Sequence, residues 1–507
     1  RAQVTLASLM SRPIRSVLVA NRGEIALRVI RTCRAMGIRT VAVYSEADAG
    51  ALHVREADSA IPIGKAASSE SYLRIDRILE AAKEAGVDAI HPGYGFLSQN
   101  GDFADACAAA GFTFIGPKGD VHRLMGDKKA ARQQVQKFAV PVVPGYDGED
   151  QSDARLAAEA SRIGFPLMIK PSRGGGGKGM HVTNNAAEFE AVLPRARRES
   201  LSSFGNDFLV LERFVQKPRH VEVQVLFDQH GKGVHLFERE CSVQRRHQKV
   251  IEETPSVALD ADLRQRLCAA GVAAAAAANY TNAGTVEFLL DSSGEFYFLE
   301  MNTRLQVEHP VTEMTLGIDL VRLQIEISEG KPLPFEQWHL NPRGHAIEAR
   351  LNAEDPRHHD APSPGRILHF EPPQGPFVRS DSGVATGSVV PEYYDPMIAK
   401  IIASGPTRDA ARTSLVEALR DLVVLGIATN REKLIQILES EPFRSGRIHT
   451  GVLEEIGPLP AEVPPPAGDL ALIAEALEAA PPPSGAAAAT EEKAPDPWAA
   501  ANSWRLA

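Results

Sequence analysis

The chain has 507 residues, of which 44% are hydrophobic and 24% charged, and its formal net charge is -10. This length exceeds one ordinary hydrophobic core and predicts about two to four globular domains. The acidic balance argues against nucleic acid as a partner, because phosphate neutralisation needs a basic face. No apolar run reaches the roughly 18–20 residues that cross a bilayer, so we expect no membrane partner.

Four scattered cysteines, with no CxxC pair, are typical of a reducing compartment. The N-terminus lacks the apolar core of a signal peptide. We therefore predict a cytoplasmic protein, and we interpret residues 1–9 as a vector-derived or leader segment before Met10.

The first region alternates between strand and helix patterns. An apolar run at 16–20 precedes an amphipathic stretch at 25–36, and a second apolar run follows at 40–44. This rhythm predicts βαβ units in a parallel sheet, continued by runs at 87–90 and 112–115. The turn after the first run is not GxGxxG, so the dinucleotide fingerprint is absent.

The second region contains a glycine-rich loop. A helix is predicted at 127–138 and a strand at 167–170, and four glycines then stand between Arg173 and Lys178. Glycines beside basic residues suit a phosphate cradle, since backbone N–H groups can approach oxyanions closely. Taken alone, the run favours a surface hairpin, and it lacks the Ser or Thr of a Walker loop.

Two glutamates lie in a predicted β-hairpin at 284–301, with its turn at 293–294. Glu287 and Glu300 both sit in apolar strands, where an unpaired carboxylate is costly to bury. They could share Mg²⁺, which prefers oxygen ligands, or they could be solvated residues on a strand face.

Polar residues continue at every second position after Glu300. If the chain stays extended, alternate side chains share one face, which would carry varied functional groups. The sequence leaves open whether the segment is extended through Glu308 or bends after Asn302 and forms a loop. A plain edge strand seldom shows this variety, so the pattern favours a functional site. The alternating residues are Glu300, Asn302, Arg304, Gln306 and Glu308.

The remaining signals are weaker one by one. Residues 244–249 could be a solvated basic loop or an anion site, and residues 91–96 could be a structural turn. A third region begins near 344, rich in strands to about 402 and helical from 408 to 422. Residues 458–495 are dense in Pro, Ala and Gly and are predicted to be a flexible linker.

Together these segments resemble the biotin carboxylase family of the ATP-grasp superfamily, most of all the α-subunits of acyl-CoA carboxylases. The match runs in order from about residue 14 to residue 455. The segments that carry it are 19–26, 91–98, 125–128, 170–180, 244–249, 300–312, 350–356 and 394–400.

The resemblance implies an α/β fold with three domains. They are an N-terminal Rossmann-like (pre-ATP-grasp) domain at 14–124, an ATP-grasp domain at 125–343 with a mobile lid at about 141–214, and a C-terminal α+β domain at 344–455. Residues 456–507 would be a linker and the start of a missing bridging domain.

The resemblance also implies residue roles. Glu308 would deprotonate bicarbonate, and Arg350 would stabilise the biotin enolate. Lys249 and Arg304 would bind bicarbonate, with Gln306 and Val307 nearby, and Tyr94 and Gly95 would contact biotin. Glu287, Glu300 and Asn302 would hold Mg²⁺ or Mn²⁺. The residues expected at the nucleotide are Lys128, Lys170, Gly174, Gly175, Gly176, Gly177, Glu212, Val215, His220, Gln244 and His247.

The implied reaction is ATP- and bicarbonate-dependent carboxylation of biotin through carboxyphosphate. No Met-Lys-Met carrier motif is present, so the biotinyl lysine is expected on another chain or a missing C-terminal part. A carboxyltransferase β-subunit and a homodimer or larger hetero-oligomer are implied as partners. Residues 358–364 lack the Phe-Leu that commonly precedes Pro-Ser in relatives, and we expect only a local packing difference. The alternatives are another ATP-grasp carboxylate–amine ligase and a non-catalytic scaffold subunit.

Overall fold

The computed structural model describes residues 13–172 and 179–460. Arg173, Lys178 and the predicted phosphate loop between them lie outside the described residues, as do residues 461–507 of the predicted linker. In the described part, no helix is long and apolar enough to cross a membrane.

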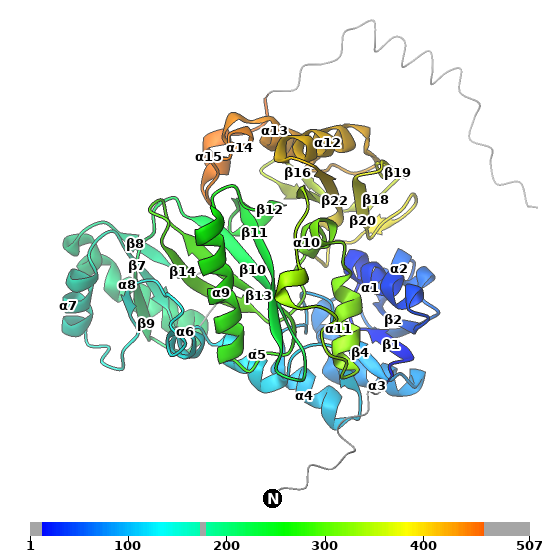
Figure 1. The fold of residues 1–507 in the computed structure, drawn as a ribbon, viewed down its shortest axis with the longest axis horizontal. Helices are drawn as coiled ribbons and strands as arrows, with labels where there is room; N and C mark the ends of the chain where they lie inside the picture. The colour runs from blue at the N-terminus through cyan, green and yellow to red at the C-terminus, as the bar shows by residue number, and fades with distance from the viewer. Residues whose placement is uncertain (1–12, 173–178, 461–507) are drawn as a thin grey trace, which may run out of the picture. The chain divides into compact units, whose positions relative to one another are not determined.

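The N-terminal region is a parallel sheet in the order β3-β2-β1-β4-β5, flanked by helices (Figure 1). The predicted βαβ units are confirmed, because β1 pairs in parallel with both β2 and β4. The bounds are β1 Ser16–Val19, α1 Gly23–Ala35, β2 Arg39–Ser45, α2 Leu52–Glu56, β3 Ser59–Gly64, α3 Ile75–Ala85, β4 Ala89–His91, α4 Gly101–Ala109, β5 Thr113–Phe114 and α5 Gly119–Gly126.

The predicted lid segment has its own sheet, in the order β6-β9-β7-β8, and its own apolar core. Two helices, α7 and α8, pack on this sheet. The bounds are α6 Lys128–Gln136, β6 Gly145–Tyr146, α7 Asp153–Ile163, β7 Leu167–Pro171, β8 His181–Thr183, α8 Ala186–Phe204 and β9 Leu209–Arg213.

The largest sheet has the strand order β14-β13-β10-β11-β12-β15-β22-β20. β12 pairs with β15, so the sheet runs unbroken across the boundary predicted at 343–344. The predicted hairpin is confirmed as β13 and β14. The bounds are β10 Arg219–Phe227, β11 Gly233–Arg245, β12 Gln248–Thr254, α9 Ala261–Ala277, β13 Asn282–Leu290, β14 Phe296–Asn302, α10 His309–Leu316, α11 Leu320–Ser328, β15 His345–Asn352, β20 Val378–Ser382 and β22 Met397–Gly405.

Helices cover the C-terminal half of this sheet. α12 packs on β15 and β22 in a continuous apolar core, while α10 packs against β11, β12, β15 and β22 (Figure 1). The N-terminus of α10 therefore meets the strands that carry the predicted catalytic residues. The remaining bounds are β16 Glu354–Asp355, β17 Ala361–Pro362, β18 Gly365–Arg366, β19 His369–Glu371, β21 Val389–Val390, α12 Arg408–Asp421, β23 Val423–Leu425, α13 Arg431–Glu439, α14 Glu441–Arg444 and α15 Val452–Ile456.

Candidate active site

The segment after Glu300 stays extended only as far as Asn302, which decides between the two alternatives that the sequence left open. β14 ends at Asn302, and the chain then bends into a turn that leads to α10. The cause is long-range: Gln99 accepts a hydrogen bond from the Thr303 N–H at 3.0 Å, and the Thr303 hydroxyl is 2.7 Å from His122 Nδ1. The side chain of Leu305 is fully buried in the apolar core. Glu308 consequently comes from a helix start and not from a strand face.

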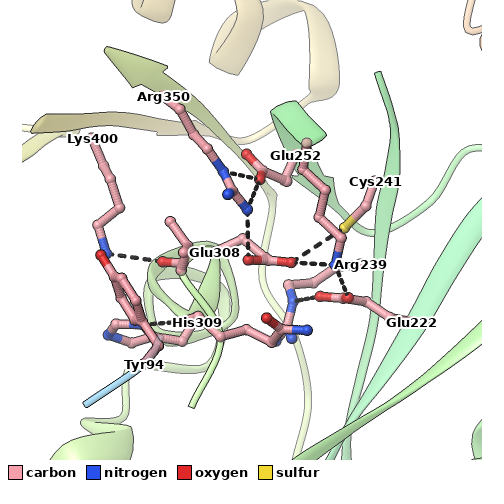
Figure 2. Close-up of polar contacts among 12 residues, drawn as sticks. Tyr94, Glu222, Arg239, Cys241, Glu252, Glu308, His309, Arg350 and Lys400 are labelled. Carbon is pink, nitrogen blue, oxygen red and sulfur yellow. Dashed lines mark hydrogen bonds and ion pairs between the residues drawn. The ribbon is translucent and has the colours of Figure 1, made fainter. Parts of the chain in front are cut away.

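Glu308 is fully buried, and its two oxygens have different partners (Figure 2). Oε1 accepts hydrogen bonds from Lys249 Nζ at 2.6 Å and from the Cys241 thiol at 3.8 Å. Oε2 accepts one from Arg350 Nη2 at 2.9 Å. Burial alone would raise the pKa of Glu308, but the charges of Lys249, Arg350 and Arg239 outweigh burial and hold it well below its usual range. Glu308 is therefore an ionised carboxylate that pairs with both Lys249 and Arg350, the two cations predicted to bind bicarbonate and biotin.

Lys249 lies at the centre of three carboxylates. Its Nζ is 2.5 Å from Glu222 Oε2, 2.9 Å from Glu287 Oε1 and 2.6 Å from Glu308 Oε1. Glu222 is in turn held by Arg239, whose guanidinium is fully buried and 2.6 Å from the other oxygen of Glu222. The sequence did not indicate that Glu222 and Arg239 hold Lys249 in place, because both residues stand in ordinary strand patterns.

Glu287 and Glu300 face each other across the hairpin, as the metal prediction requires. Glu287 is engaged by Lys249 and by His220, whose Nε2 is 3.0 Å from Glu287 Oε2, whereas Glu300 makes no hydrogen bond or ion pair with a described residue. Burial and the charge of Glu287 raise the pKa of Glu300. An unpaired oxygen donor beside a second carboxylate fits a divalent cation of the Mg²⁺ class.

Asn302, the third predicted metal ligand, already uses its side-chain amide in hydrogen bonds to neighbouring residues. Its Nδ2 donates to Glu287 at 2.9 Å, while its Oδ1 accepts from Arg304 Nη2 at 3.1 Å. Arg304 also donates to Gln306 Oε1 at 2.7 Å, and it forms no ion pair within the described residues. A partly buried guanidinium without a carboxylate partner is suited to an anionic ligand.

The predicted nucleotide residues that the structure describes line one cavity of about 580 Å³. Lys170 pairs with Glu212, and Arg132 lies 3.0 Å from the other Glu212 oxygen. Apolar side chains missing from the prediction, Met168 and Leu289, share this wall. Both lie two positions from a predicted polar residue on the same strand, which is the sequence signal that could have found them. The predicted residues in this wall are Lys128, Lys170, Glu212, Val215, His220, Gln244, His247, Glu287 and Glu300.

A second cavity, of 470 Å³, contains the predicted biotin residues Tyr94 and Gly95 together with the start of α1. Asn21 shapes this wall, since its Nδ2 donates to the Pro92 and Tyr94 carbonyls at 2.7 and 2.8 Å. A third cavity, of 300 Å³, lies between the other two. It shares His220, His247, Glu287 and Glu300 among its lining residues with the nucleotide cavity, and Arg304, Val307 and Arg350 with the Tyr94 cavity.

Lys400 and Glu24 were not assigned a role from the sequence. Lys400 is fully buried opposite Arg350 on the neighbouring strand, and its Nζ donates to the Val307 carbonyl at 2.9 Å (Figure 2). Glu24 Oε1 lies 3.0 Å from the same ammonium, and its other oxygen accepts from the Tyr94 hydroxyl. Lys400 thus holds the peptide that precedes Glu308. A lysine inside the apolar strand at 397–405 was the available signal.

Three protein-family models match the chain in order. They are biotin carboxylase, N-terminal domain, over residues 13–121, carbamoyl-phosphate synthase L chain, ATP binding domain, over 127–336, and biotin carboxylase C-terminal domain, over 348–455.

Individual relatives agree with these matches. A biotin carboxylase from Nostoc is 49% identical over 440 residues, which are 87% of this chain and 98% of that protein. The α-subunit of mitochondrial methylcrotonoyl-CoA carboxylase from Rattus norvegicus is 49% identical over 443 residues, and the chain spans only 62% of its length. A solved dimer of the biotin carboxylase domain of Hydrogenobacter thermophilus 2-oxoglutarate carboxylase, in complex with MgADP, ADP and bicarbonate, is 43% identical, with a TM-score of 0.83 over 88% of this chain and 98% of that one.

Fold and site together define an enzyme of the ATP-grasp class. The chain belongs to the biotin carboxylase family. The predicted family, fold class and enzyme class are confirmed. The predicted domain boundaries and the roles of single residues stay predictions.

Proposed function

We propose that this chain carboxylates biotin on a carrier, using ATP and bicarbonate, as the first half-reaction of an acyl-CoA carboxylase. The observation that carries the proposal is the row of three adjoining cavities with shared walls. A nucleotide would occupy the cavity at Lys128 and Lys170, bicarbonate the middle one, and the biotin ring the cavity at Tyr94.

Bicarbonate activation requires a cation to hold the anion and a base to remove its proton. Arg304 offers a guanidinium that has no ion-pair partner in the described part of the chain, and Lys249 places its ammonium between Glu287 and Glu308. Glu308 would take the proton as bicarbonate attacks the γ-phosphate to give carboxyphosphate. Magnesium or manganese bound by Glu287 and Glu300 would supply neutralising charge for the phosphates.

Arg350 connects this step to biotin. It is ion-paired to the base Glu308 in the resting site, which weakens the base. When the biotin ureido oxygen engages Arg350, Glu308 loses part of that stabilisation and becomes more basic. Carboxyphosphate then releases CO₂ and phosphate, and the phosphate takes the proton from the ureido nitrogen. Arg350 stabilises the negative charge on the resulting enolate oxygen while the deprotonated nitrogen attacks CO₂.

Partners and location are inferred from the relatives. Several relatives are named as subunits of larger carboxylases, and one solved neighbour is a dimer. We extend this to a biotin carrier domain or protein, a carboxyltransferase β-subunit and a homodimer or larger hetero-oligomer for this chain. The unpaired cysteines support a reducing compartment such as the cytoplasm, whereas some relatives are named mitochondrial or chloroplastic.

The proposal is tested by ATP hydrolysis. Hydrolysis should require bicarbonate, should rise when free biotin is added, and should form carboxybiotin from labelled bicarbonate. If an amine substrate replaced biotin, the chain would be a carboxylate–amine ligase, and if biotin had no effect, the assignment would be wrong.

Glu308→Gln keeps the shape of the side chain but removes the base. We expect carboxybiotin formation to fall by about 10²-fold or more, since general-base catalysis contributes roughly 10²–10⁴-fold. Glu371→Gln, at a glutamate exposed on β19, is the control and should retain wild-type activity. Undiminished carboxylation by Glu308→Gln would rule out this base.

A further inference from the structure

Glu348 is a buried glutamate that the proposed mechanism leaves without a role. It lies on β15 two residues before Arg350, so both side chains point to the same face of the sheet. On the adjacent strand β12 its direct partner is Glu252, which binds Arg350 Nε through Oε1 at 2.6 Å. Glu348 is 0% exposed.

The carboxyl group of Glu348 has no hydrogen-bond partner for either oxygen among the described residues. The charged groups that face it are Arg350 on its own strand, Glu252 on β12, Lys400 on β22 and Glu308 at the start of α10, with the Tyr94 hydroxyl from the loop after β4. Lys400 already forms an ion pair with Glu24 and donates a hydrogen bond to the Val307 carbonyl. An isolated carboxylate in this position would be strongly destabilising.

Burial raises the pKa of Glu348 well above its usual range, and the charge of Glu252 adds to the increase, although Lys400 opposes it. The same surroundings raise the pKa of Glu252 to about 7, where burial is opposed by Arg350 and reinforced by Glu308. Among the described residues, Glu308 is also paired with Lys249, whereas Glu252 forms an ion pair with Arg350 alone and Glu348 forms none. Glu252 and Glu348 therefore cannot both be ionised cheaply beside one guanidinium.

We propose that Glu348 is a positioning residue that stays neutral and protonated, so that Arg350 is held by two carboxylates and not by three. The inference rests on the proposed function, because it concerns the same Arg350. Figure 2 shows Arg350 between Glu252 and Glu308. A third carboxylate would hold the guanidinium on the sheet, whereas a neutral Glu348 lets it turn toward the biotin oxygen.

This assignment has a pH signature. As the pH rises through the high pKa of Glu348, its carboxyl group ionises and becomes a third carboxylate that holds Arg350. The kcat/KM for biotin then declines. Glu348→Gln is neutral at every pH. The alkaline decline caused by this group should therefore disappear in that variant.

The experiment measures kcat and KM for free biotin in biotin-stimulated ATP hydrolysis, from about pH 7 to about pH 10. In Glu348→Gln the alkaline limb of kcat/KM should move upward by about one pH unit or more, mainly through KM, because Arg350 contacts biotin and not ATP. Glu371→Gln, at an exposed glutamate, should reproduce the wild-type profile. If Glu348→Gln does not fold, Glu348→Met, which is also uncharged, is measured in the same way.

Two results would overturn the inference. One is an alkaline limb that does not move in a folded neutral variant. The other is a loss of about tenfold or more near pH 7, which would mean that the ionised form is needed. Failure of the proposed function is distinguishable, because the wild-type enzyme itself would then show no stimulation by biotin.

Discussion

The two carboxylates of the β13–β14 hairpin differ in their surroundings. Glu287 is already compensated by Lys249 and His220, whereas Glu300 has no partner among the described residues. A bound cation would therefore change the electrostatics of Glu300 more than those of Glu287.

This difference gives a prediction for Glu300→Gln. The variant should need about tenfold or more free Mg²⁺ for half-maximal ATP hydrolysis, because loss of one charged ligand weakens a site built on few carboxylates. Titration of Mg²⁺ against ATPase rate measures the shift, and chelator should abolish wild-type activity. Glu295→Gln, at the exposed turn of the same hairpin, is the matched control. An equal Mg²⁺ requirement in both variants would contradict the metal assignment.

Single residues were predictable from sequence to the extent that their neighbours are local. That Glu287 and Glu300 face each other follows from hairpin geometry, whereas the role expected for Arg304 rests on the family resemblance. Glu222, Glu252 and Lys400 gain their roles from pairing between distant strands and from the approach of α10, and no local pattern contains that information.

The turn between β14 and α10 sets the position of the base. Thr303 is fixed by residues 204 and 181 positions away in the chain, Gln99 and His122. The sequence pattern indicated a polar segment but left open whether the strand continues to Glu308 or bends after Asn302, because the contacts that decide this are long-range. The predicted βαβ units and hairpin rest on local periodicity and were correct.

Thr303→Val tests this turn. Valine fits the space but removes the hydroxyl, leaving His122 without a partner at either ring nitrogen among the described residues. We expect a loss of about 1–3 kcal/mol in the free energy of unfolding and a lower kcat. Urea unfolding and steady-state kinetics measure both. Thr303→Ser keeps the hydrogen bond and should stay close to wild type, and similar losses in both variants would refute this explanation.

Buried ion pairs of Glu253 connect α12 to the large sheet. Glu253 on β12 lies 2.6 Å from His345 Nε2 and 2.6 Å from Arg408 Nε. Burial would raise the pKa of Glu253, but these two partners lower it below its usual 4.5. Because the folded-state pKa is depressed, the stabilisation is present above pH 4.5 and is lost as the pH falls through the folded-state pKa.

Glu253→Gln should consequently lower the free energy of unfolding by about 3–5 kcal/mol at neutral pH, since it leaves Arg408 without its buried partner. The difference in the free energy of unfolding between the variant and the wild type should become smaller in acid, because wild-type Glu253 is then protonated and uncharged like the glutamine. Urea unfolding at several pH values measures the gap, with the exposed Glu371→Gln as control. A gap that is independent of pH would show that the ion pair is not its cause.

At the scale of the whole described molecule, the site depends on contact between the C-terminal region and α1. Gly383, just after β20, lies so close to α1 that an added Cβ would meet the Glu24 nitrogen at 2.6 Å and the Gly23 carbonyl carbon at 3.0 Å. Lys400 reaches Glu24 across the same contact. The sequence could not show this, because the start of α1 and the residues Gly383 and Lys400 lie far apart in the chain, and no local pattern links them.

Gly383→Ala should push this contact apart without touching the nucleotide cavity. Overpacking typically costs about 1–3 kcal/mol, and the displaced part of the site is the Tyr94 cavity, so we expect KM for biotin to rise by roughly tenfold. Bicarbonate-dependent ATP hydrolysis without biotin should change much less, because Lys128 and Lys170 lie on other elements. Gly50→Ala is the control, since nothing lies within 4 Å of its added Cβ. Equal losses with and without biotin would mean that the contact supports the fold as a whole and not the biotin end of the site.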